Sequence, residues 1–416
     1  MAFLTLSAPL QATILIAVGL LLGMAANWGI YRFAWFPRDI SPWSKRHADA
    51  GPGYWYDRLP VLGWLFLRRD EHLHGSFFWI RPLLIEIACA VGLWALFRHE
   101  ITGGTLPVSL RLEFALQPLQ IALLGQFVAH ALLFWGLLVA TFIDFDEQTI
   151  PDSVTVTGAL LGIVLSVLLP VPLLPISFES GITFCGAVSY GELPAWMLDG
   201  KGLALCCSIM LAWGFALVPA LCTLRRGLWK GIAFYWVTFF RGGYAYWLLA
   251  IALMACAWIS YVWFQWPAAK PALVSSVIGL GFGGGLVWAV RIIGQIALGK
   301  EAMGFGDVTL MAMIGAFLGW QAALIVFFLS PVAALFVSLA QWIFSGRRDI
   351  AFGPYLSLAA VMVVVGWDRV WNNFAREIFS LGSLVPQLLG LGLILMLILL
   401  ASWRAIEQRF FGDAPQ

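Results

Sequence analysis

The sequence predicts an all-α protein, a polytopic transmembrane helical bundle of about 9–11 spans with a loop domain after the first span. Of the 416 residues, 61% are hydrophobic and 11% are charged, whereas soluble domains have about 45–50% apolar and about 25% charged residues. The apolar residues also gather in blocks of about 20, the length that crosses a hydrocarbon core. Backbone polar groups in lipid must pair within their own segment, so each block is expected to be a helix.

Eleven apolar blocks can be separated along the chain. Their centres lie near Leu20, Ala88, Ala131, Leu161, Leu211, Ala255, Leu286, Ile314, Leu335, Val361 and Leu393. The first block, residues 10–30, has no basic stretch before it and no clear small-residue cleavage site after it. We therefore expect a span there rather than a removable signal peptide. Glycines at 281, 283, 284 and 285 indicate close helix packing rather than a phosphate-binding loop.

Lysine and arginine in the loops set the predicted orientation. The segment 33–80 carries many of them, and further basic positions follow at 225–230, 300, 347–348 and 404–409. Counting spans alternately from an outside N-terminus puts all of these positions on the cytoplasmic side. The chain is therefore expected to consist of a first span (1–32), a cytoplasmic loop domain (33–80) and a membrane bundle (81–416).

Composition gives little reason to expect nucleic acid, a metal or a cofactor. The net charge of +2 is too small to suggest a nucleic-acid partner. None of the six cysteines forms a CxxC pair, so neither a zinc site nor a disulfide framework is indicated. His72 and His74 in the loop domain form a lone His-x-His, which is a weak metal signal. We predict no metal and no cofactor, and the oligomeric state is left open.

Two acidic segments stand at the ends of predicted spans, where acids are costly and need a reason. The first, residues 142–152 (FIDFDEQTIPD), lies where one helix ends and the next begins. Its acids are Asp144, Asp146, Glu147 and Asp152. The second, residues 303–310 (MGFGDVTL), opens a helix. Gly304 and Gly306 let the backbone bend tightly there, and Asp307 stands on the first turn, where the helix dipole favours a carboxylate.

Asp144 and Asp307 are both expected at the cytoplasmic ends of their helices, and this placement on the same membrane side allows their carboxylates to meet. Two nearby carboxylates cannot both ionise easily and can share one proton. The ionised member can act as general base on a water molecule, while the protonated member polarises a peptide carbonyl and then supplies a proton to the leaving amine. This hydrolysis requires neither a metal nor a covalent intermediate.

Other interpretations of these acids stay open at this point. Asp307 could cap its helix, and the acids of 142–152 could be solvated interface charges. A transporter of about ten spans could use the same acids to couple protons or cations, although they are expected near one membrane face rather than at the midplane. A non-catalytic protein that serves in the assembly of a secretion system is a further alternative.

At these residues the chain resembles the type IV prepilin peptidases, the leader peptidases of type IV pili and type II secretion. The family has an Asp several residues before a Pro-Asp pair, as in Asp144 with Pro151 and Asp152, and a GxGD motif, as in 304–307. Further similar segments are 23–32 (GMAANWGIYR), 55–65 (WYDRLPVLGWL), 81–86 (RPLLIE) and 352–356 (FGPYL). The resemblance implies an aspartic endopeptidase that uses Asp144 and Asp307.

The resemblance also implies a substrate and a place in the cell. The substrate would be a prepilin or pseudopilin precursor, cleaved at the cytoplasmic face of the bacterial inner membrane. The basic leader of this precursor could pair with Asp146, Glu147 or Asp152, and Glu86 would support the site from a neighbouring helix.

Two departures from the family pattern bear on these expectations. The loop 33–80 lacks the two CxxC pairs of typical members, which removes the ground for expecting their N-methyltransferase activity. The interval between the two aspartates is also longer than usual. The excess, residues 174–271, is interpreted as an insertion of two spans and an outer loop.

Overall fold

The computed structural model confirms an all-α, polytopic membrane bundle. It describes residues 3–47, 49–102, 104–105, 117–169, 173–178, 181–183, 193–217, 243–298, 303–345 and 352–411. Each of the eleven predicted centres lies within an apolar helix. Among the described residues, six helices are long and apolar enough to cross a membrane, and shorter apolar helices cover the other five centres.

The chain forms two compact units. The first comprises residues 1–158, 169–172 and 329–368, and the second comprises residues 159–168, 173–328 and 369–416. Two helices, α6 (Asp152–Leu168) and α13 (Trp320–Ser345), contribute a segment to each unit.

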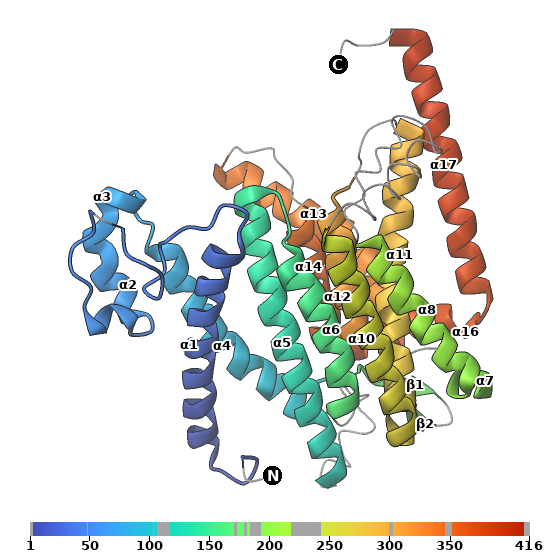
Figure 1. Ribbon diagram of the computed structural model, residues 1–416, viewed down its shortest axis with the longest axis horizontal. Coiled ribbons are helices and arrows are strands. Elements are labelled where there is room, and N and C mark those ends of the chain that lie inside the picture. The colour runs from blue at the N-terminus through green and yellow to red at the C-terminus, as the bar shows by residue number, and fades with distance from the viewer. Residues whose placement is uncertain are drawn as a thin grey trace. The chain divides into compact units, whose positions relative to one another are not determined.

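The first unit is built on three long helices, α1 (Ala8–Phe33), α4 (Ile80–Ile101) and α5 (Gln117–Glu147), together with α14 (Gly353–Val365). Helices α1 and α4 lie side by side (Figure 1). A Cβ atom at Gly23 would lie 2.6 Å from the Glu86 Cα atom, so the small residue lets the two backbones approach closely. A buried pair links α4 to α5, in which His130 Nδ1 lies 2.7 Å from Glu100 Oε1.

The segment 33–80, the predicted loop domain, connects α1 and α4 within the first unit, and that it forms a separate domain stays a prediction. It contains the 3₁₀ helix η1 (Trp55–Arg58), α2 (Leu62–Leu67), η2 (Arg68–Asp70) and α3 (Glu71–His74). Two salt bridges connect its parts: Arg69 lies 2.6 Å from Asp57, and Arg46 lies 2.7 Å from Asp70. Burial raises the pKa of Asp57, but hydrogen bonds from Arg69 and from the Tyr54 amide outweigh it, so that the pKa lies below its usual value.

The second unit contains most of the elements after α6. In chain order they are β1 (Ile176–Phe178), β2 (Gly181–Thr183), α7 (Ala195–Leu198), α8 (Gly200–Ala216), α10 (Gly243–Gln265), η5 (Pro267–Ala269), α11 (Lys270–Leu298), α12 (Phe305–Leu318), the π-helical turn η6 (Trp371–Ala375), α16 (Arg376–Ser380) and α17 (Leu384–Phe411). The short helix α15 (Trp367–Val370) spans the boundary between the units. Strands β1 and β2 pair antiparallel, with Ile176 opposite Thr183, and add a short hairpin that the sequence did not predict.

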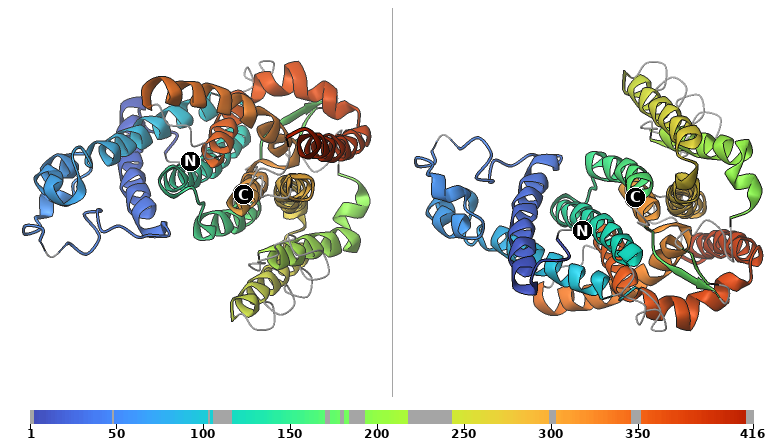
Figure 2. Two further views of the ribbon diagram at one scale, coloured as in Figure 1. Left: turned by 90° about the horizontal axis from the view of Figure 1, so that it is seen from above. Right: turned by 90° about the horizontal axis from the view of Figure 1, so that it is seen from below.

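The predicted insertion, residues 174–271, contains the two apolar helices α8 and α10 and the hairpin. The two helices pack side by side in both views of Figure 2. Gly214 of α8 makes this contact close, since a Cβ atom there would lie 2.7 Å from the Ala252 Cβ atom of α10. That this segment is an insertion stays a prediction.

Candidate functional site

Asp144 lies on the last turn of α5 and is 5% exposed. Its Oδ2 atom accepts a hydrogen bond of 3.2 Å from the backbone N–H of Gly353. Gly353 is the first residue of α14, and Pro354 follows it. The carboxylate therefore meets the N-terminus of a second helix, where free N–H groups and the helix dipole suit a negative charge.

The contact between Asp144 and α14 requires glycine at position 353. A Cβ atom there would lie 2.6 Å from Asp144 Oδ2 and 2.7 Å from the Ile150 Cδ1 atom. Both distances are shorter than an ordinary contact, which is roughly 3.5 Å. The segment 352–356, which the sequence singled out by resemblance alone, thus touches the carboxylate of Asp144 across 209 positions of chain.

Asp146 and Glu147 follow Asp144 and already have partners within the chain. Arg38 and Arg81 each lie 2.6 Å from a different oxygen of Asp146. The oxygens of Glu147 accept the backbone N–H groups of residues 35 and 36 at 2.7 and 3.1 Å. These contacts connect the end of α5 to the start of α4 and to the segment after α1.

Asp307 stands on the first turn of α12 and is 7% exposed. Gly304 is the N-cap residue and Gly306 the second helical residue, as the sequence predicted. Arg291 of α11 contacts the residues around the start of α12. Its Nε atom donates to the Met303 carbonyl at 3.2 Å, and its guanidinium lies 5.5 Å from the centroid of the Phe305 ring.

Helix α12 is buried along its whole length from Asp307 to Leu318. It packs on α11 at two glycines, because a Cβ atom at Gly279 would collide with the Gly315 carbonyl and a Cβ atom at Gly315 with the Gly279 carbonyl. The Ser276 hydroxyl also donates to the Ala316 carbonyl at 2.7 Å. This packing fixes the helix that carries Asp307.

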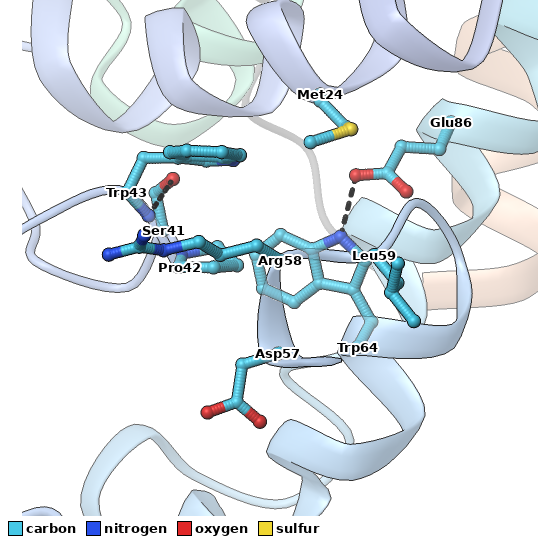
Figure 3. Close-up of a pocket in the computed structure, with 9 residues that line it drawn as sticks. All are labelled: Met24, Ser41, Pro42, Trp43, Asp57, Arg58, Leu59, Trp64 and Glu86. Atoms are coloured by element: carbon cyan, nitrogen blue, oxygen red, sulfur yellow. Dashed lines mark hydrogen bonds between the residues drawn. The ribbon is translucent and has the colours of Figure 1, made fainter. Parts of the chain in front are cut away.

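Glu86 is 2% exposed and joins the loop domain to the spans. It accepts hydrogen bonds from Asn27 Nδ2 at 3.2 Å, from Trp64 Nε1 at 2.8 Å and from the Val61 backbone N–H at 2.5 Å. Figure 3 shows the Trp64 indole pointing toward Glu86, while Asp57 points away from it. In the first unit Glu86 therefore positions the loop domain.

The predicted site residues fall in both units. The first unit holds Asp144, Asp146, Glu147, Glu86 and Asp152, the exposed first residue of α6. The second unit holds Gly304, Gly306 and Asp307. Within the described ranges, no three His, Cys, Asp or Glu side chains gather as a metal site would require.

Residues 203–339 match the sequence profile of the Type IV leader peptidase family. The chain is similar to this family. The matched range includes the GFGD segment with Asp307, excludes Asp144, and overlaps the predicted insertion over residues 203–271.

Three relatives called prepilin leader peptidase/N-methyltransferase illustrate the similarity. The protein of Aeromonas hydrophila is 34% identical over 102 residues, which cover 24% of this chain and 35% of the relative. That of Pseudomonas aeruginosa is 29% identical over 108 residues, 25% of this chain and 37% of the relative. That of Xanthomonas campestris is 38% identical over 113 residues, 26% of this chain and 37% of the relative.

The chain spans roughly a third of the length of the curated relatives that it matches. No solved structure matches it significantly. The family profile and the three relatives confirm the predicted resemblance to the leader peptidases.

Sequence reasoning left several positioning residues out of the site. The sequence marks Gly353, because this residue lies in a segment that resembles the family. Nothing in the sequence predicts that its backbone N–H contacts Asp144. Arg38, Arg81 and Arg291 looked like ordinary loop or span-end cations, and no local pattern assigns them their partners.

Proposed function

We propose that this protein is an aspartic endopeptidase of the prepilin leader peptidase type. The observation that carries the proposal is the family match over residues 203–339, which includes the helix start with Asp307. The N-terminus of α14, which holds Asp144 in the first unit, supports it. The proposed substrate is a prepilin-like or pseudopilin precursor, cleaved at the cytoplasmic face of the inner membrane.

In the proposed reaction the carboxyl groups of Asp144 and Asp307 share one proton. The ionised carboxylate takes a proton from a water molecule as its oxygen attacks the scissile carbonyl carbon. The protonated carboxyl donates a hydrogen bond to the carbonyl oxygen, which becomes negatively charged in the tetrahedral intermediate. Collapse of that intermediate breaks the C–N bond, and the leaving amine takes up a proton from the pair.

The proposal is limited to cleavage. Loop 33–80 has no cysteine, so the methyltransferase part of the relatives' name is not carried over. Gly304 and Gly306 would leave room for an extended substrate segment beside Asp307. Glu86 would act as a positioning residue, and Asp146, Glu147 and Asp152 are the acids that we propose for pairing with a basic leader.

Purified full-length protein in lipid, mixed with a prepilin-like precursor from the same genome, tests the proposal. Asp144→Asn and Asp307→Asn should each reduce cleavage by at least about a hundredfold, equivalent to about 2.7 kcal/mol of activation free energy. Both variants should melt as the wild type does. The exposed Asp49 provides a matched control, because Asp49→Asn should leave the rate unchanged.

The proposed pair is wrong if either variant cleaves at the wild-type rate. If no form cleaves any precursor, proton flux into proteoliposomes tests transport instead. The mass of the cleaved product reports on methylation separately.

A further inference from the structure

The loop domain contacts α1 and α4 well inside the ends of these two helices. Glu86 and its partner Asn27 lie six residues from the nearer ends, Ile80 of α4 and Phe33 of α1, or about 9 Å along each helix axis. Helix α4 has 22 residues and is therefore about 33 Å long, close to the roughly 30 Å of a hydrocarbon core. A hydrocarbon layer that begins near Ile80 would therefore enclose the loop segment that binds Glu86.

Figure 1 agrees with this depth, since α2 lies beside the C-terminal part of α1 rather than beyond its end. The other end of α2 returns toward the membrane surface. Arg68, which follows α2, has its guanidinium 5.9 Å from the centroid of the Trp79 ring, immediately before α4 begins. Arginine and tryptophan are typical of the membrane–water interface.

The backbone N–H groups at the end of α2 near Glu86 are paired within the protein. The N–H groups of Leu59, Leu62 and Gly63 donate to backbone carbonyls at 3.1, 2.6 and 2.8 Å, and Pro60 has no N–H. The N–H of Val61 donates to Glu86, although Val61 has a φ of 62° that a β-branched residue rarely adopts. Irregular backbone can lie at membrane depth only when its polar groups are satisfied in this way.

The side chains of α2 divide into two sets. Trp64 and Leu67 are buried against the protein, with exposed fractions of 2% and 5%. Leu62, Leu65 and Phe66 point outward and are 51%, 44% and 46% exposed. Three large apolar side chains on one face of a six-residue helix would be unfavourable in water.

The spanning helix α4 also has large apolar side chains on its outside. Leu84, Ile87 and Val91 of the spanning helix α4 are 56%, 40% and 57% exposed. Among the ionic side chains of the loop domain, Asp57 pairs with Arg69 and Asp70 pairs with Arg46. The exposed Arg58 lies over the Trp43 ring and is long enough to extend its charged end toward the interface.

We propose that α2 lies within the membrane leaflet on the side where α1 ends, and that Leu62, Leu65 and Phe66 contact lipid acyl chains. Helix α2 and the turn before it then form a membrane-embedded cap on α1 and α4, while α3 and the charged side chains of the loop domain lie outside the apolar layer. This inference does not depend on the proposed peptidase activity.

Photo-crosslinking in vesicles of phosphatidylethanolamine and phosphatidylglycerol tests the proposal. Full-length protein would carry p-benzoyl-phenylalanine at Leu62, Leu65 or Phe66 in three separate variants. The same group at His72, an exposed residue of α3, is the matched control. Because α2 is expected to lie in lipid, adducts with the mass of a phospholipid should be at least about fivefold more frequent at the α2 positions than at His72.

Two results would overturn the proposal. Equal lipid labelling at α2 and His72, in variants that melt like the wild type, would put α2 in water. Crosslinks from α2 mainly to a second copy of the chain, or to an added precursor in place of lipid, would assign the apolar face to that protein partner.

Discussion

Replacing Gly353 by alanine perturbs the proposed site at one atom. The added Cβ atom would lie 2.6 Å from Asp144 Oδ2, about 1 Å short of an ordinary contact of roughly 3.5 Å. The same Cβ atom would lie 2.7 Å from the Ile150 Cδ1 atom. Because it cannot shift toward Ile150, the Asp144 carboxylate must move. It would also lose its backbone donor, a hydrogen bond to a charged group worth about 1.5–3 kcal/mol.

The expected effect on catalysis is large and the effect on folding is modest. A displacement of about 1 Å in a reacting group costs about a hundredfold in rate. We therefore expect kcat/KM for precursor cleavage to fall about a hundredfold, whereas overpacking of this kind destabilises a protein by about 1–3 kcal/mol. Cleavage kinetics and a thermal melt of the same sample measure the two effects.

Gly92→Ala in α4 is the matched control, since a Cβ atom there meets nothing within 4 Å. It should leave both cleavage and stability close to wild type. Wild-type cleavage by Gly353→Ala would refute the reasoning, because the Asp144 carboxylate would then not need its place at α14. Complete unfolding of Gly353→Ala would also refute it, since the change would act on the fold and not on the carboxylate.

Three further predictions concern the parts of the protein around the site. Asp57→Asn should destabilise the loop domain by about 1.5–3 kcal/mol, since Arg69 loses its charged hydrogen-bond acceptor. Because the folded pKa of Asp57 is lowered, its stabilisation is present above about pH 4 and is lost as the pH falls through the folded value. Limited proteolysis of wild type, and not of the variant, should therefore rise with acid. Gly279→Val should separate α11 from α12 and lower the melting temperature together with cleavage, because the new side chain meets a backbone carbonyl. Glu100→Gln should lower the melting temperature of the protein, because it removes the carboxylate that lies 2.7 Å from His130 Nδ1 in a fully buried position.

Each of these predictions has a control in the same element or domain. Asp49→Asn in the loop domain should leave proteolysis unchanged, since its pair with His47 is largely exposed. Gly285→Ala in α11 should be neutral, because that position faces open space. In α4, Gly92→Ala is the control for Glu100→Gln and should leave the melting temperature unchanged. A loss of stability in a control equal to that in its partner variant would contradict the reasoning for that prediction.

The sequence by itself determined the fold class and the helices. Hydropathy is a local property, and about 20 apolar residues in lipid have few alternatives to a helix, so each of the eleven predicted centres lies in one. The turn at Asp307 was also predictable, because glycines at a helix start act within a few residues. The hairpin β1–β2 was not, since strands of three residues are too short for periodicity to show.

Tertiary structure alone decided which groups surround the predicted acids. Asp144 meets Gly353, Asp146 meets Arg38 and Arg81, and Glu86 holds Trp64. These partners are separated along the chain by between 22 and 209 positions. The sequence marks such residues by type, but which of them meet depends on how the helices pack, and the packing follows from the shapes of many distant side chains at once.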